Sequence, residues 1–143
     1  MRLYLDTAYI AKCYINEPER RQVKKLVEGA TGLYSSALSL AEMACVFQRQ
    51  VREGKMTTHQ AAKWQSRFHE DVRDGVWVLL PVSQHLLFRV ASLVSGMPPE
   101  AYLRGADAVH LVTAVDAGFT EIWSNDRRLL AAAPYFGLEG RSV

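Results

Sequence analysis

The sequence predicts an α/β fold in which helices cover both faces of a mainly parallel sheet of about five strands. Short apolar runs alternate with longer segments whose apolar residues recur at helical spacing, the pattern of successive strand–helix units. The run from Val76 to Leu80 is apolar at every position, as expected for a parallel strand buried on both faces. The 143 residues fit one domain that spans residues 1–143.

The predicted strands are short and are bounded by polar residues, glycine or proline. They cover residues 3–5, 33–36, 76–80 and 121–124, and the tail at 137–143 is expected to add a fifth. Connections between parallel strands are right-handed, and their helices pack on both sides of the sheet. The sequence therefore predicts three layers.

The predicted helices follow from their start and stop signals. They cover residues 7–15, 17–28, 38–53, 57–74, 83–95, 104–117 and 126–133. The second begins at residues 17–19, Glu-Pro-Glu, because proline suits an early position and acids suit the first turn. Thr57 and Gln60 form a capping box for the fourth. In the third, the expected buried stripe is Leu40, Met43, Phe47 and Val51.

Charge and cysteine content exclude several classes. Lysine and arginine total 17 against 15 acids, a net charge of +2 that is too small to identify a nucleic-acid-binding protein by itself. Cys13 and Cys45 lie in apolar stretches without C-x-x-C spacing, so we expect free, buried thiols rather than a zinc site or a disulfide. No apolar run approaches a membrane span, and Asp6 interrupts any signal-peptide core. We expect a cytoplasmic protein without membrane contacts.

Four acidic residues fall where an open α/β sheet binds ligands. Asp6 comes just after the first strand, and Asp126 just after the fourth. Glu42 lies in the opening turns of the helix after the second strand, and Asp107 lies in the first turn of the sixth helix. Because ligands bind outside the carboxyl ends of the strands, we expect the four acids to meet at one end of the sheet.

Each acid also has a purely structural explanation. Asp6 suits the N-cap of the first helix, and Asp107 and Asp126 lie at helix starts, where an acid stabilises the macrodipole. Glu42 is the only charged residue in the first half of its helix, and a salt bridge to Arg49 is its alternative role. Their shared position at one edge of the sheet favours a functional cluster.

Clustered carboxylates need a cation and suit a particular chemistry. Two carboxylates about 4 Å apart repel each other by about 4 kcal/mol at an effective dielectric near ~20. Their hard oxygens favour Mg²⁺ or Mn²⁺ over zinc, and such a metal activates water and stabilises charge on a phosphoryl oxygen. The sequence has no G-x-S-x-G motif and no Gly-rich phosphate loop. It therefore predicts metal-assisted phosphodiester hydrolysis. His110, one turn after Asp107, fits support of this site, but a packed or capping role is favoured.

Four motifs occur in order over nearly the whole chain. They are residues 4–8 (YLDTA), followed by Ala11-Lys12 and by Glu-Pro-Glu at 17–19; residues 36–42 (SALSLAE); residues 104–111 (RGADAVHL); and residues 124–129 (SNDRRL). Together they resemble the motifs of the PIN-domain ribonucleases, and within them the VapC-type toxins of bacterial toxin–antitoxin pairs. Ala8 stands where serine is common in that family, and Ser124 where threonine is common.

The resemblance implies a three-layer α/β/α PIN-like fold, with residues 1–143 forming a single PIN domain. It implies Mg²⁺- or Mn²⁺-dependent endonuclease action on an RNA substrate, with Asp6, Glu42, Asp107 and Asp126 as the catalytic and metal-binding residues. It also implies a homodimer and a cognate antitoxin protein that inserts a segment into the active-site groove. Nothing in the sequence indicates which RNA is cut.

The basic residues divide into three groups. Arg104, Arg127 and Arg128 are expected near the acids, where they would steer phosphates. Arg20, Arg21, Lys24 and Lys25 suit a solvated helix face, and Arg49, Arg52 and Lys55 fit either role. The aromatic residues Phe47, Trp64 and Phe68 suit either a dimer or antitoxin groove or ordinary core packing.

Three other functions are compatible with parts of this sequence. A receiver domain or aspartyl-phosphate phosphatase needs a lysine from a late strand, and no lysine follows Lys63. A PIN-like protein kept only for binding would be expected to lack one of the acids, and all four are present. A PIN ribonuclease that processes RNA outside a toxin pair has the same sequence features, and this alternative stays open.

Overall fold

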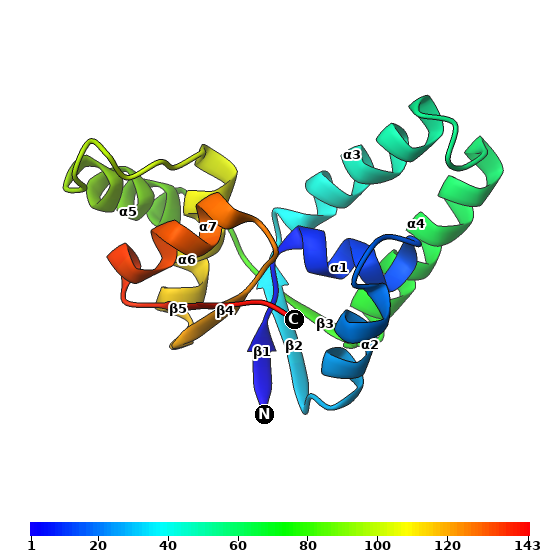
Figure 1. The fold of residues 1–143 in the computed structure, drawn as a ribbon, viewed down its shortest axis with the longest axis horizontal. Helices are drawn as coiled ribbons and strands as arrows, with labels where there is room; N and C mark the ends of the chain where they lie inside the picture. The colour runs from blue at the N-terminus through cyan, green and yellow to red at the C-terminus, as the bar shows by residue number, and fades with distance from the viewer.

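Parallel strands form the centre of the computed structural model, which describes residues 1–143 (Figure 1). β1 (Arg2–Tyr4), β2 (Gly32–Ser36) and β3 (Trp77–Leu80) pair in that order, and β4 (Glu121–Trp123) pairs with β5 (Glu139–Arg141). All of these pairs are parallel. A parallel bridge from Leu5 to Trp123 joins the two parts, so the strand order is β3-β2-β1-β4-β5. The predicted mainly parallel, five-stranded sheet is confirmed.

Helices cover the sheet from two sides, which gives the predicted three-layer α/β/α fold (Figure 1). The helices are α1 (Thr7–Tyr14), α2 (Arg20–Glu28), α3 (Ser39–Arg52), α4 (Thr58–Arg73), α5 (Gln84–Ser95), α6 (Gly105–Asp116) and α7 (Arg127–Ala132), with a 3₁₀ turn η1 (Ala133–Phe136) before β5. The first four lie on one side and the last three on the other, and α3 with α4 projects as an arm (Figure 1). None of these helices is long and apolar enough to cross a membrane.

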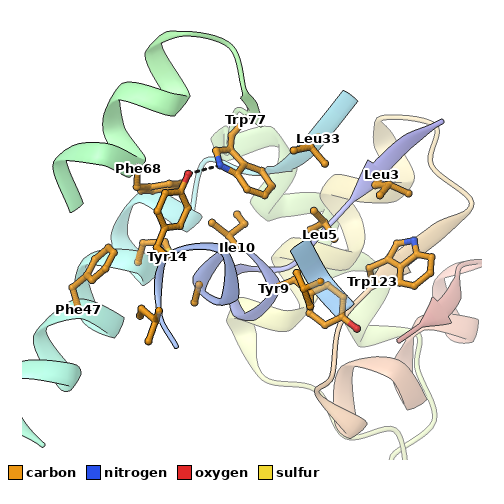
Figure 2. Packing of buried hydrophobic residues seen from close by; sticks show 14 of the residues in the cluster. Leu3, Leu5, Tyr9, Ile10, Tyr14, Leu33, Phe47, Phe68, Trp77 and Trp123 are labelled. Carbon is orange, nitrogen blue, oxygen red and sulfur yellow. Dashed lines mark hydrogen bonds between the residues drawn. The ribbon is translucent and has the colours of Figure 1, made fainter. Parts of the chain in front are cut away.

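The strand alternation distributes the core over both faces of the sheet. Leu3 and Leu5 point into a cluster with residues of α1, α3, α4 and β3, whereas Tyr4 points into the cluster formed with α6, α7 and η1. In the first cluster the Trp77 indole donates a 2.7 Å hydrogen bond to the hydroxyl of Tyr14, which packs edge-on against Phe68 (Figure 2). The phenyl rings of Phe47 and Phe68 are fully enclosed, so core packing, rather than a dimer or antitoxin groove, is their role.

Several local predictions are confirmed by the helix ends. Thr57 accepts from the Gln60 amide while the Gln60 side chain accepts from the Thr57 amide, so the capping box is present. Ser83 caps α5, and the tail forms β5 as expected. Asp126 caps α7 with its side chain.

Four predictions of local structure are wrong. The second helix begins at Arg20, because Glu19 adopts a left-handed conformation with φ 64° and Glu17 and Glu19 instead pair with the buried ammonium group of Lys12. Leu40 and Cys45 are exposed, since they lie on the outer side of α3. Val78 is also exposed, since β3 is an edge strand of the sheet.

Candidate functional site

The order of the strands along the chain reverses direction between β1 and β4, at the centre of the sheet. The chain runs outward from β1 to β2 and β3 on one side and to β4 and β5 on the other, so β1 and β4 diverge at a topological switch point. Asp6 follows β1, and its amide donates a 3.1 Å hydrogen bond to the Trp123 carbonyl at the end of β4. Asp126 begins α7 directly after β4. Two of the predicted site residues are therefore positioned by the sheet itself.

A cavity of about 730 Å³ opens at this point. All four predicted acids, Asp6, Glu42, Asp107 and Asp126, line it, as do Thr7, His110, Arg49, Arg52 and Arg104. The fold thus brings the four acids to one cavity from α1, α3, α6 and α7. No three acidic, histidine or cysteine side chains come close enough to form a ready-made metal centre. The four acids therefore share one cavity, but their side chains are not drawn together into a closed set of metal ligands.

Asp6 is held rigidly at the base of α1. It is 5% exposed, its Oδ1 accepts a 3.0 Å hydrogen bond from the Tyr9 amide, and its Oδ2 accepts one from the Ser124 hydroxyl. Ser124 Oγ in turn accepts from the Asp126 amide at 2.9 Å, which ties the two acids together. Burial raises the pKa of Asp6 from 3.8 to about 6, because these hydrogen bonds only partly replace lost hydration. The N-cap role expected as an alternative is real and coexists with a position in the cavity.

Glu42 is fixed by donors from two other helices. Its Oε1 accepts a 2.8 Å hydrogen bond from the Thr7 hydroxyl and lies 2.7 Å from Nε2 of His110. Burial alone would raise the pKa of Glu42, but the hydrogen bond and charge of His110, with the Thr7 hydroxyl, lower it below its ordinary value. Arg49 pairs with Glu53 at 3.9 Å rather than with Glu42, so the expected alternative salt bridge is absent.

His110 is more closely tied to the site than its sequence position indicated. It is buried, and besides Glu42 it contacts the Thr7 hydroxyl at 3.2 Å and, through Nδ1, the Tyr4 hydroxyl at 3.1 Å. Thr7 also contacts Ser39, so strand β1 and helices α1, α3 and α6 share one polar network. The side chain is packed, as predicted, and it also contacts Glu42 of the cavity, as the alternative role requires. The signal was its position three residues after Asp107, on the same helix face.

Arg104 spans two of the acids. Its Nε donates a 3.0 Å hydrogen bond to Asp107, and its second nitrogen lies 2.6 Å from an Asp126 carboxylate oxygen. The hydrogen bond and charge of Asp107 raise the pKa of Arg104, with a smaller contribution from Asp126. The side chain of Arg104 is 53% exposed, against 13% and 29% for the two acids, so it covers them from the solvent side.

The other basic residues considered for the site line two different pockets. Arg49 and Arg52 of α3 line the cavity opposite Arg104. Arg127 and Arg128 follow Asp126 directly, as expected, but they border a smaller pocket with Tyr102 instead of lining the cavity.

The donor set fits a hard divalent cation. Every acidic group in the cavity offers carboxylate oxygens, and no cysteine sulfur lies beside them except the exposed Cys45 at the rim. Asp107 and Asp126 already attract a cationic group, Arg104, and the raised pKa of Asp6 reflects a buried carboxylate without a cationic partner. Mg²⁺ commonly uses one or two carboxylates and keeps several waters, so a wide cavity with separated acids suits it.

The comparisons with known proteins agree with this architecture. Solved structures with the same fold include VapC20 of Mycobacterium tuberculosis, a sarcin–ricin loop cleaving toxin, at 16% identity and a TM-score of 0.69, covering 91% of this chain and 94% of that one. VapBC2 of Rickettsia felis, bound to a DNA fragment from its promoter, has 14% identity and a TM-score of 0.67, and the match covers 99% of this chain and 98% of that one. FitAcB of Neisseria gonorrhoeae has 15% identity and a TM-score of 0.65, and the match covers 98% of this chain and 96% of that one.

Identities this low establish the fold alone. Among curated proteins, none is significantly similar in sequence. The model of the PIN domain family, however, matches residues 3–134. This range covers nearly the whole chain and contains all four acids. The chain therefore belongs to the PIN domain family.

Proposed function

We propose that this chain is a divalent-metal-dependent endoribonuclease and acts as the toxin of a VapBC-type toxin–antitoxin pair. The observation that carries the proposal is the cavity at the β1–β4 switch point, which is lined by the four predicted carboxylates and by three arginines. Membership of the PIN domain family supports hydrolysis of RNA. Asp6, Glu42, Asp107 and Asp126 are the residues that would hold Mg²⁺ or Mn²⁺.

The chain's own groups are suited to a phosphodiester substrate. Arg49 and Arg52 of α3 line the acidic cavity and offer positive charge to the RNA backbone, whereas Arg104 already pairs with Asp107 and Asp126. Asp6 and Glu42 are each held by two hydrogen bonds, so their carboxylates keep their orientation without reorganisation. A bound divalent cation would supply an activated water and neutralise charge on the phosphoryl oxygens.

The toxin assignment is supported by the structural relatives. VapC20 is a toxin. This chain also shares its fold with one chain in the VapBC2 structure and one in the FitAcB structure. By the same likeness we propose a homodimer and a cognate antitoxin that covers the cavity. Expression of the chain alone in a bacterium would then arrest growth, and co-expression of the antitoxin would restore it.

Cleavage of a mixed RNA pool tests the enzymatic proposal. The purified chain is incubated with Mg²⁺ or Mn²⁺, with EDTA, and as the Asp6→Asn variant, which keeps the N-cap and the side-chain volume. We expect cutting only by the wild-type chain with metal. The matched control is Asp116→Asn, an acid on α6 that pairs with Arg89 away from the cavity and is expected to cut normally. Undiminished cutting by Asp6→Asn would refute the site, and cutting in EDTA would refute the metal dependence.

A further inference from the structure

Two exposed tyrosines and two exposed arginines gather beside the acidic cavity. Tyr102, Arg127, Arg128 and Tyr135 border a shallow pocket of about 250 Å³, formed by the segment before α6, by α7 and by η1. We call these four residues the Tyr102–Arg128 platform. Its segments lie on the same side of the sheet as α6 (Figure 1). Only one acid, Glu100, lines the pocket.

The fold does not account for this exposure. Tyr102 is 56% exposed and Tyr135 is 50% exposed, whereas Tyr4, Tyr9 and Tyr14 are buried. The Arg128 guanidinium lies 4.1 Å from the centre of the Tyr102 ring, so the two planar groups are already stacked. Neither Arg127 nor Arg128 forms an ion pair. The platform therefore presents aromatic surface and two uncompensated positive charges to the solvent.

The chain connects the platform directly to the acids. Tyr102 precedes Arg104 by two residues, and Arg128 follows Asp126 by two residues. Arg104 itself joins Asp107 to Asp126. An RNA strand whose phosphate lies at these acids would therefore place a neighbouring nucleotide over the platform.

We infer that the Tyr102–Arg128 platform binds an unpaired nucleobase of the RNA, stacked on the Tyr102 and Arg128 planes, with an adjoining phosphate against Arg127. This inference rests on the proposed function and adds a base-binding subsite outside the acidic cavity. Stacking on aromatic rings and guanidinium planes requires a splayed base, which a continuous duplex does not offer. Because every base has such a face, the platform selects unpaired structure more than sequence.

The test measures binding separately from cleavage. A short, fluorescently labelled single-stranded RNA of mixed sequence is titrated with the Asp6→Asn chain in Mg²⁺, and the affinity is followed by anisotropy. The same strand is then annealed to its complement. Further substitutions in this background are Tyr102→Ala, Tyr102→Phe and Arg128→Gln. Arg21→Gln, an exposed arginine of α2, is the charge-matched control.

We expect Tyr102→Ala to weaken binding of the single strand about tenfold and Tyr102→Phe to bind normally, because the ring is kept. Arg128→Gln should weaken binding more than Arg21→Gln. The duplex should bind more weakly and should not respond to Tyr102→Ala. A set of single strands, each with one abasic nucleotide, gives a test from the ligand side: at one position the loss of the base should abolish the effect of Tyr102→Ala.

Three results would overturn the platform: no measurable binding of the single strand, equal binding by Tyr102→Ala, or equal losses on duplex and single strand. Melting temperatures of the variants identify any loss due to unfolding, and the abasic strands test the idea without any change in the platform. The two proposals also fail separately. Absence of cleavage by the wild-type chain refutes the nuclease while the binding differences stand, and normal cleavage with Tyr102-independent binding refutes only the platform.

Discussion

Nε2 of His110 lies 2.7 Å from Oε1 of Glu42, and this contact joins α6 to α3 beside the acidic cavity. The other imidazole nitrogen contacts the Tyr4 hydroxyl, so the ring is held from both sides. Because the imidazole is buried, its removal takes one hydrogen-bond partner from each of Glu42, Thr7 and Tyr4. We propose that His110 positions Glu42 for metal binding.

The first prediction follows from that contact. His110→Ala is expected to lower the RNA cleavage rate about tenfold or more, as for outer groups that orient carboxylates, and to lower the free energy of unfolding by about 1–3 kcal/mol. Cleavage kinetics and urea denaturation measure the two effects. His85→Ala, an exposed histidine of α5, is the control and should change neither. Normal cleavage by His110→Ala would show that Glu42 needs no such support.

The second prediction concerns the stability of the metal-free protein as pH changes. The pKa of Asp6 is about 6 in the folded chain against an ordinary 3.8, so the folded state holds the proton more tightly than the unfolded state. Stability contributed by the protonated group is therefore lost as pH rises from about 4 to about 6, and the total loss is on the order of 3 kcal/mol. In EDTA, the wild-type chain should lose about 2 kcal/mol more than Asp6→Asn between pH about 4.5 and about 7.5. Parallel curves for the two proteins would contradict the burial argument.

The third prediction concerns Arg104 as a competitor of the metal. Its single guanidinium pairs with both Asp107 and Asp126, so Arg104→Gln should leave those carboxylates free for a cation. Because the arginine is half exposed, the pair contributes at most about 1 kcal/mol, which corresponds to about a fivefold gain in Mn²⁺ affinity. Calorimetric titration with Mn²⁺ measures this gain. Arg89→Gln removes a comparable exposed pair with Asp116 and should leave the affinity unchanged. Weaker Mn²⁺ binding by Arg104→Gln would assign Arg104 a supporting role instead.

The fourth prediction tests the packing of the last strand. A Cβ on Gly140 would lie 2.9 Å from Cδ2 and 3.1 Å from Cα of Leu130, so β5 and α7 approach closely only because the residue is glycine. Gly140→Ala should lower the free energy of unfolding by about 1–3 kcal/mol. The control is Gly105→Ala, where a Cβ would meet nothing within 4 Å, and its unfolding curve should not be lowered. Equal stability of both variants would mean that Leu130 moves aside without lowering the free energy of unfolding.

Most of the fold was predictable because its signals are local. Apolar periodicity, the Thr57–Gln60 capping box and the Ser83 cap each depend on residues within one or two turns, and the structure has all three. The start of α2 was mispredicted because the two glutamates pair with Lys12, which lies in the preceding helix. The exposure of Val78 depends on its strand being at the edge of the sheet, which no local pattern reveals.

The sequence by itself determined the α/β class, the order of the elements and which four acids line the cavity, because strand–helix alternation brings residues after strand ends to one edge of the sheet. Only the tertiary structure decided their partners. Asp6 meets Ser124 across 118 positions of sequence, and His110 meets Glu42 across 68. Such contacts depend on strand order and helix packing, which local propensities do not specify. The same reason explains why Arg104 reaches the acids and Arg128 stacks on Tyr102 instead.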